Sequence, residues 1–286
     1  MAAHPGRYQP LLSDARADLT HEVEAVDERG RVTTLAIPAE RPLTVYVDKR
    51  ELVTLMTLGG APEALTLGYL RNQRLIKSID DIVSVQVDWA VDAVAVVTRH
   101  GIADVEQRTA KKVVTTGCGQ GSVFGGLMDE VELISLPAEA RLRQSVVYRI
   151  VETIRTQQSI YKQAGSVHGC ALFSGDGELL YFAEDVGRHN AVDAIAGRMW
   201  LDAVSGADKV FYTTGRLTSE MVIKGAQMGI PFLLSRSGTT QMGHMVAGTV
   251  GMSLLARCTG KHFLLLNGHE RLEFEPGLLD PNLKPL

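Results

Sequence analysis

The stretch KVFYTTGRLTSEMVIKGAQMGIPFLLS, residues 209–235, contains a strand, a helix and a second strand in immediate succession. Residues 209–214 are mostly apolar, β-branched or aromatic, which predicts a buried strand. Residues 218–228 have the pattern of a helix, and Gly229 and the proline two residues later mark its end. Residues 231–235 form the next predicted strand. This succession places the chain in the α/β class.

The alternation of strands and helices continues on both sides of this stretch. Upstream, a helix is expected over about 138–164, a hairpin over 169–185 and another helix over 190–200. Downstream, we expect a helix over about 240–257 and a closing strand in KHFLLLNG, residues 261–268. Such an order predicts a mixed sheet that is covered by helices on both faces.

The first half of the chain has a different pattern. Residues 1–30 lack sustained periodicity, which predicts a loosely held N-terminal arm. Residues 31–136 contain several short strands and one helix that begins at Pro62, so we expect a smaller, strand-rich α+β domain there. Leu136 and the proline that follows it mark the predicted boundary to a larger α/β domain over residues 137–286.

The composition excludes several classes of protein. A formal net charge of −4 and a pI near 6.1 provide no general attraction to nucleic acid or to an anionic membrane. No apolar run approaches the ~18 residues of a membrane-spanning helix, and the first residues do not resemble a signal peptide. We therefore expect a cytoplasmic protein. Its three widely spaced cysteines are expected to remain thiols.

Three junctions between a strand and a helix carry a glycine within two residues of an arginine, together with hydroxyl or amide donors. Phosphate oxygens bind to such groups, because glycine permits close approach of the backbone and arginine supplies fixed charge. Three such junctions predict a multiply phosphorylated ligand, although ordinary helix capping explains any single one. The usual dinucleotide and P-loop glycine motifs are absent from the sequence. The candidate residues are Gly187, Arg188, His189, Gly215, Arg216, Ser219, Arg236 and Ser237.

Cys118 lies in a glycine-rich stretch, GCGQG, that gives its side chain little cover. Lys111 and Lys112 could lower the pKa of the thiol and favour the reactive thiolate. The alternative is a surface loop whose thiol has no function. Cys170 and Cys258 have apolar neighbours in the sequence and are predicted to be core thiols.

Together these motifs resemble the FdhD formate dehydrogenase accessory sulfurtransferases. The resemblance covers about residues 30–275 and is densest in SVHGCALF, EDVGRHNAVD, TTGRLTSEMVIKGAQMGIPFLLSRSG and HFLLLNGHERL. It implies a cytidine-deaminase-like mixed-sheet α/β/α domain and a homodimer. It also implies that the protein handles the molybdenum bis-guanine-dinucleotide cofactor, which would be its cargo.

The resemblance also implies roles for individual residues. Cys118 would take sulfur as a persulfide from a cysteine desulfurase and pass it to the cofactor before that cofactor enters formate dehydrogenase. The glycine–arginine junctions would bind the phosphates and guanine of the cofactor. The closing strand would contact the cofactor through Phe263, Leu264, Leu265, Leu266, Asn267 and Gly268.

One departure from the family pattern concerns the cysteine loop. The family loop carries a second cysteine, and this chain has Gly121 at that position. Release of sulfur would then need an external thiol or reductant, or Cys170 brought close by folding.

Two alternative functions follow. The protein could be a cofactor-binding chaperone without sulfur chemistry. It could also be a zinc deaminase, but GRLTSE stands where the cysteine pair that binds zinc would be needed, so no metal site is predicted.

Overall fold

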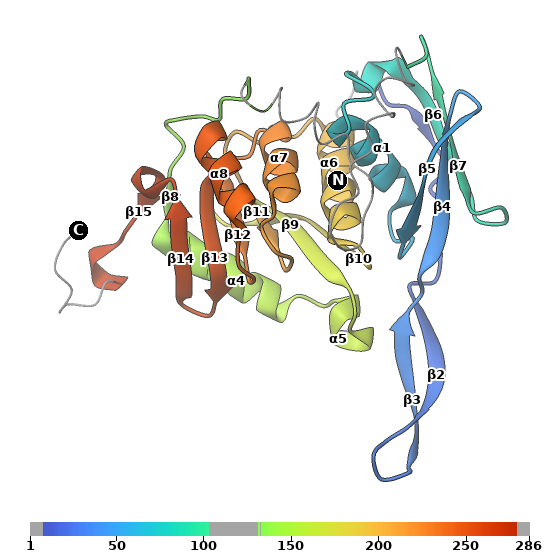
Figure 1. Cartoon of the computed structure of the whole chain (residues 1–286), viewed down its shortest axis with the longest axis horizontal. Helices are drawn as coiled ribbons and strands as arrows, with labels where there is room; N and C mark the ends of the chain where they lie inside the picture. The colour runs from blue at the N-terminus through green and yellow to red at the C-terminus, as the bar shows by residue number, and fades with distance from the viewer. Residues whose placement is uncertain (1–7, 103–130, 132, 279–286) are drawn as a thin grey trace. The chain divides into compact units, whose positions relative to one another are not determined.

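The computed structural model describes residues 8–102, 131 and 133–278, which belong to two compact units (Figure 1). Both units are discontinuous in sequence, because the chain passes from one to the other inside strands β9 and β10. The predicted boundaries after residues 30 and 136 stay predictions. Unit 1 comprises Met1–Met128, Gln158–Cys170 and Phe182–Val204, and unit 2 comprises Asp129–Gln157, Ala171–Tyr181 and Ser205–Leu286.

Unit 1 contains a five-stranded sheet with the order β1-β6-β7-β4-β5. Alternate residues of β4, namely Leu43, Val45 and Val47, are buried, as expected for a strand with one face on a core. A tight turn at Asp48 and Lys49, both with positive φ, joins β4 to β5. The strands are β1 (Leu11–Leu12), β4 (Arg41–Val47), β5 (Arg50–Thr57), β6 (Ile82–Asp88) and β7 (Ala93–Thr98), and a short 3-10 helix covers Ile79–Asp81.

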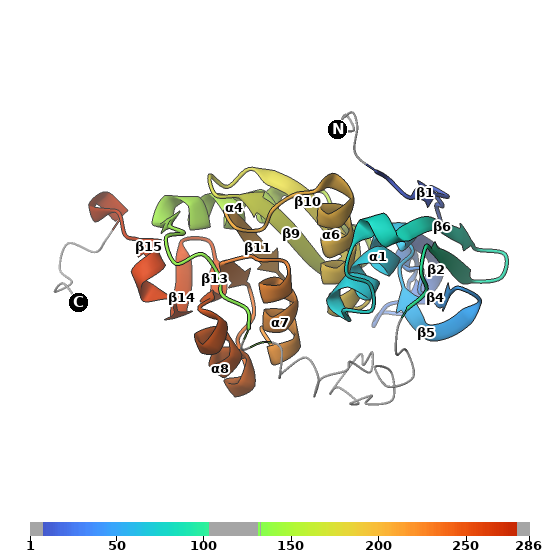
Figure 2. The same ribbon diagram turned by 90° about the horizontal axis from the view of Figure 1, so that it is seen from above.

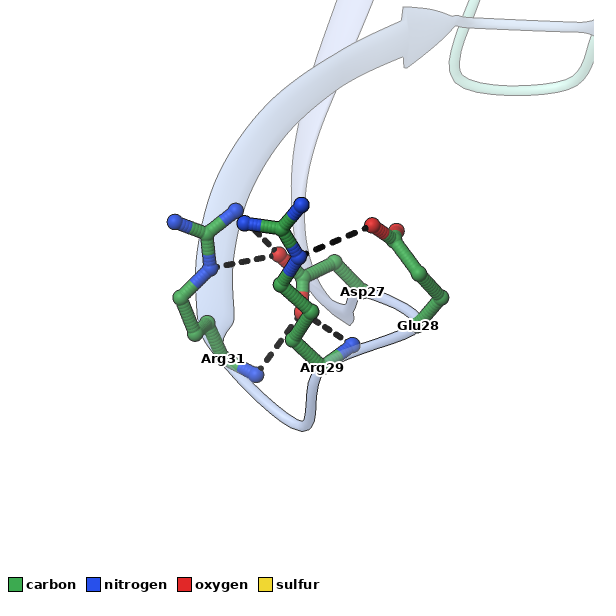
Figure 3. Close-up of polar contacts among 4 residues, drawn as sticks. All are labelled: Asp27, Glu28, Arg29 and Arg31. Atoms are coloured by element: carbon green, nitrogen blue, oxygen red, sulfur yellow. Dashed lines mark hydrogen bonds and ion pairs between the residues drawn. The ribbon is translucent and has the colours of Figure 1, made fainter.

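A two-stranded hairpin, β2 (Thr20–Val26) with β3 (Val32–Pro38), projects from this sheet within unit 1 (Figure 1). At its tip, Asp27 accepts hydrogen bonds from the backbone N–H groups of Arg29 and Arg31, both at 2.9 Å (Figure 3). These bonds and the Arg31 guanidinium lower the pKa of Asp27. The prediction of a loosely held arm is therefore wrong for residues 20–26, because antiparallel pairing with β3 holds them as a strand.

Helices α1 (Pro62–Asn72) and α6 (Arg188–Asp202) pack closely together in unit 1. Glycine is required on both sides of their contact. A Cβ atom at Gly68 would lie 1.7 Å from the backbone oxygen of Asp193, and one at Gly197 would lie 1.9 Å from that of Ala64. Asn72 Nδ2 also donates a hydrogen bond of 2.7 Å to Asp193 Oδ1 across the same contact. The two helices thus approach at backbone distance.

Strands β9 to β14 form a six-stranded sheet with the order β10-β9-β11-β12-β13-β14. In unit 2, β11, β12 and β13 are parallel and β14 is antiparallel to β13, which confirms the predicted mixed sheet. Figures 1 and 2 show α4 (Gln144–Thr156) on one face of these strands and α7 (Ser219–Gln227) and α8 (Gln241–Val250) on the other. The strands are β9 (His168–Ser174), β10 (Leu179–Asp185), β11 (Lys209–Thr213), β12 (Phe232–Ser235), β13 (Ser253–Thr259) and β14 (His262–Asn267).

Two predicted helices differ from the structure. The helix expected over 138–164 begins only at Gln144 and is divided into α4 and α5 (Ile160–Ala164), and Ser159 caps the second by accepting a bond from Lys162 N. The helix expected over 240–257 ends at Val250, because Gly251 adopts a left-handed conformation with φ of 69°. Residues 253–256 then run fully buried inside the sheet as part of β13. A short apolar run fits a buried helix and a buried strand equally well, so its pattern alone does not decide between them.

Smaller elements complete the described chain. Strand β8 (Leu142–Arg143) pairs in parallel with β15 (Leu272–Glu273), and 3-10 helices cover His269–Arg271 and Pro276–Leu278. Across the residues that the structure describes, no helix has the length and apolarity needed to cross a membrane.

Candidate functional site

Two adjacent parallel strands of unit 2 end in the same kind of turn. Thr213 and Ser235 are the last residues of β11 and β12, and the strand register pairs them with each other. Gly215 N donates to Thr213 Oγ1 at 3.1 Å, and Ser237 N donates to Ser235 Oγ at 2.8 Å. Each buried hydroxyl therefore bends the backbone that follows its own strand.

These two turns are hydrogen-bonded to each other. Ser235 Oγ donates a bond of 2.6 Å to the carbonyl oxygen of Gly215, and Arg236 N donates one of 3.3 Å to the carbonyl oxygen of Thr213. We call residues 213–219 and 235–240 the arginine loops, because each carries one arginine of the predicted site. The structure thus brings the second and third predicted junctions together.

Backbone contacts further along strengthen the pairing of the arginine loops. Leu217 N donates to the Gly238 carbonyl at 2.9 Å, and Thr240 N donates to the Leu217 carbonyl at 3.1 Å. Helix α8 lies close to the same point, since a Cβ atom at Gly243 would be 2.4 Å from the Leu217 oxygen. The loops are therefore held by backbone as well as by side chains.

Both arginine side chains of the loops, Arg216 and Arg236, are exposed, and Ser219 is the first residue of α7. The N-cap residue of α7, Thr218, makes no capping hydrogen bond with its side chain, whereas Thr240 caps α8 by accepting from Gly243 N. The partial positive charge at the start of α7 is thus not offset by its own cap side chain. Guanidinium groups and helix N-termini both favour anionic oxygen atoms, and the arginine loops supply two arginines and the start of α7.

The closing strand β14 connects with the arginine loops through α8. His244 of α8 shares a hydrogen bond of 2.9 Å between its Nε2 atom and the Leu266 carbonyl oxygen. Asn267 Nδ2 donates to the Met252 carbonyl at 2.6 Å. Gly268 has φ of 72°, and a Cβ atom there would lie 2.1 Å from the hydroxyl oxygen of Ser253. Asn267 and Gly268 therefore have structural roles at the end of β14, and their predicted contacts with a cofactor stay a prediction.

The remaining predicted residues of this strand form one run, and their side chains differ in exposure. Leu264 is 39% exposed, whereas Phe263 is half-buried and its ring lies 6.0 Å from that of Tyr148 on α4. The neighbouring Leu265 and Leu266 are half-buried.

The first predicted junction belongs to unit 1 and centres on a buried carboxylate, Asp185. One of its oxygen atoms accepts bonds from Gly187 N at 3.1 Å and Asn190 Nδ2 at 2.8 Å. The other accepts from Thr57 Oγ1 at 2.5 Å and Leu58 N at 3.1 Å. Burial raises the pKa of Asp185, and the four donors oppose that shift. Asp185 therefore anchors the start of α6 to the end of β5.

Arg188 and His189 begin α6 and are both buried, with 5% and 2% of their surface exposed. The loop after β5 that reaches this junction was missed by sequence reasoning. Its signal is the run TLGG, residues 57–60, in which Gly59 N donates to Thr57 Oγ1 at 3.1 Å. This is the turn that also follows β11 and β12, and it recurs because a hydroxyl residue ends the strand.

Of the three cysteines, Cys118 lies outside the described residues. Cys170 and Cys258 are buried, with 0% and 1% exposed, which confirms the prediction that they are core thiols. Burial raises the pKa of the Cys258 thiol to about 12. Neither thiol is placed to react from solution without local opening of the fold.

We predict that thiol labelling separates the three cysteines. With the native protein at pH 8, at most one thiol should react quickly with a chromogenic disulfide reagent, whereas all three should react in denaturant. A thiol whose pKa is about 12 is ionised in only about one molecule in ten thousand at pH 8. Fast labelling of two or three thiols in the native state would contradict the burial of Cys170 and Cys258.

Comparison with known proteins shows the family to which this chain belongs. The model of the FdhD/NarQ family matches residues 38–273. The chain belongs to this family. Two of the relatives that this chain matches are named sulfur carrier protein FdhD. The one from Listeria monocytogenes serotype 4b is 28% identical over 239 residues, covering 83% of this chain and 91% of the relative. That from Sulfurisphaera tokodaii is 31% identical over 259 residues, covering 89% and 96%.

A solved structure agrees with this FdhD/NarQ membership. The crystal structure of a protein from Desulfotalea psychrophila, provisionally assigned as a formate dehydrogenase accessory protein, superposes with a TM-score of 0.71 at 25% identity. The match covers 89% of this chain and 98% of that protein. The resemblance drawn from the sequence motifs is therefore confirmed at the level of the family and of the α/β fold.

Proposed function

We propose that this FdhD/NarQ protein carries sulfur as a persulfide on Cys118. In this proposal it takes the sulfur from a cysteine desulfurase and transfers it to the molybdenum bis-guanine-dinucleotide cofactor, which then enters formate dehydrogenase. Two lines support the proposal. The relatives are named sulfur carrier proteins, and the paired arginine loops of unit 2 are suited to the phosphate groups of such a cargo.

The sulfur chemistry needs one thiolate to begin and an external thiol to finish. The Cys118 thiolate attacks the terminal sulfur of the desulfurase persulfide, so that a new S–S bond forms on Cys118 and the desulfurase cysteine leaves as a thiolate. Release of that sulfur as sulfide requires two electrons. Because Gly121 occupies the position of the second loop cysteine, an external thiol supplies them by forming a mixed disulfide with Cys118.

The arginine loops would hold the cargo by its phosphate groups. Arg216 and Arg236 are exposed and are carried on loops whose backbones are bonded together, which would let both contact one ligand. Charge-assisted hydrogen bonds from arginine to phosphate are among the stronger polar contacts in proteins. The start of α7 adds backbone N–H groups to the same region.

Sulfur loading tests the proposal directly. The purified protein is incubated with a cysteine desulfurase and free cysteine, and its intact mass is measured. We expect an increase of about 32 Da, the mass of one sulfur atom.

A second function, a cofactor-binding chaperone, is favoured by the glycine at position 121, which removes the internal dithiol. Protein that binds a guanine nucleotide and gains no sulfur would establish the chaperone instead.

The family resemblance also implies a homodimer in the cytoplasm. Light scattering during size exclusion would test the dimer, and cell fractionation would test the location.

We predict that Arg216→Ala weakens binding of a guanine nucleoside diphosphate by about 1.5–3 kcal/mol, the range of a hydrogen bond to a charged group. Isothermal titration calorimetry would measure the loss. Arg198→Ala is the matched control, because Arg198 is an exposed arginine on α6 that lies outside the arginine loops. Equal affinity of the Arg216→Ala variant and the unmodified protein would remove this loop from the binding site.

A further inference from the structure

Ser235 is the point at which the two arginine loops meet. Its side chain is 0% exposed, and its single hydroxyl donates to the Gly215 carbonyl and accepts from Ser237 N. Gly215 directly precedes Arg216, and Ser237 directly follows Arg236. One buried oxygen atom therefore restrains the backbone next to both arginines.

We propose that Ser235 is a positioning residue that sets the separation of Arg216 and Arg236, so that the arginine loops clamp two adjacent phosphate groups of one ligand. This inference rests on the proposed function, because it concerns the same cargo. It adds a selectivity, for diphosphate over monophosphate, and assigns that selectivity to a residue that need not touch the ligand.

The selectivity follows from the number of arginines that each ligand contacts. A single phosphate group is satisfied by one guanidinium, so the distance between the loops has little effect on its binding. A diphosphate that contacts both arginines gains only if they are already at the right separation. The hydrogen bond of 2.6 Å between Ser235 Oγ and the Gly215 carbonyl restrains the separation of the two backbone segments that carry the arginines, because it joins one loop to the other.

Other contacts also join the two loops without the serine side chain, among them the bond from Arg236 N to the Thr213 carbonyl, which makes Ser235 separable from the fold. The backbone bonds between Leu217 and Gly238 and between Thr240 and Leu217 do not involve the serine side chain. Removal of the hydroxyl should therefore release only the Gly215 carbonyl and the Ser237 N–H, each next to an arginine, and leave the loops paired and the sheet intact.

The test compares the affinities of GDP and GMP by isothermal titration calorimetry. We expect the unmodified protein to bind GDP at least about tenfold more tightly than GMP. In Ser235→Ala, GDP affinity should fall about tenfold, while GMP affinity stays within about twofold of its original value. The ratio of GDP affinity to GMP affinity should therefore fall sharply. Circular dichroism and thermal unfolding confirm that each variant is folded.

Ser174→Ala is the matched control. Ser174 Oγ also holds a turn after a strand, since it accepts from Glu178 N at 3.1 Å, but it lies in the β9–β10 hairpin and not in the arginine loops. This variant should keep the GDP to GMP ratio of the unmodified protein. A change in that ratio equal to that of Ser235→Ala would show a general effect of lost turn hydrogen bonds and overturn the inference.

A double-mutant cycle covers the case in which Ser235→Ala does not fold. Arg216→Ala and Arg236→Ala, alone and combined, should show coupled losses for GDP and additive losses for GMP. Additive losses for both ligands, or a parallel fall of both affinities in Ser235→Ala, would refute the clamp. If the unmodified protein binds neither nucleotide, both the clamp and the cargo-binding part of the proposed function fail, whereas sulfur loading of Cys118 is tested separately by intact mass.

Discussion

Replacing Cys118 by serine is expected to abolish sulfur loading. The intact mass should remain unchanged after incubation with a cysteine desulfurase and cysteine, whereas the unmodified protein should gain about 32 Da. A thiolate attacks sulfur readily near neutral pH, but a serine hydroxyl stays protonated and does not. In cells that depend on this protein, formate dehydrogenase activity should fall to the level seen without it.

The other two cysteines provide the controls for this experiment. Cys170 and Cys258 are both buried, so Cys170→Ala and Cys258→Ala should keep the mass increase once their folding is verified. Persistent loading of Cys118→Ser would place the sulfur on another residue. Loss of loading in Cys170→Ala alone would instead bring that buried thiol into the transfer.

Substitution of Gly68 by alanine is expected to give the largest loss of stability. The added Cβ atom would lie 1.7 Å from the backbone oxygen of Asp193, and a backbone atom has no rotamer by which to move away. Helices α1 and α6 would have to separate, which weakens the Asn72–Asp193 hydrogen bond as well. We expect the free energy of unfolding to fall by at least about 3 kcal/mol, the upper end for an overpacked core. Urea unfolding measures the change.

The matched control places the same substitution in open space. Gly248 lies on the exposed face of α8, and a Cβ atom there would meet nothing within 4 Å. Gly248→Ala should therefore leave stability unchanged or raise it by up to about 1 kcal/mol, since alanine favours helix over glycine. Gly197→Ala should resemble Gly68→Ala, because its Cβ atom would lie 1.9 Å from the oxygen of Ala64. A stable Gly68→Ala variant would contradict the close approach of the two helices.

Sequence patterns predicted the elements best where local signals agree. The strand–helix–strand succession of residues 209–235 is present with nearly the expected bounds, and the arginine loops follow its two strands as expected. Prediction was wrong at residues 20–26 and 253–257, which form strands. In both segments the deciding partner is a neighbouring strand, and a pairing across the sheet leaves no periodic signal of its own.

The candidate site divides in the same way between local and long-range information. Its residue types and their order after each strand are visible in the sequence, including Arg216 and Arg236. The bond from Ser235 to Gly215 depends on the register of β11 with β12, and no local pattern specifies that register. Likewise, Thr57 and Asp185 are separated by 128 residues and meet only when the chain has folded.

By itself the sequence determined the α/β class, the family and the kinds of residue that end each strand, because these follow from local spacing and motif. Only the tertiary structure decided that the arginine loops are bonded as a pair, that Asp185 is a buried anchor, and that α1 and α6 touch at backbone distance. The physical reason is that hydrogen bonds and packing between distant segments depend on how whole elements are placed together, and a local pattern of side chains carries no record of that placement.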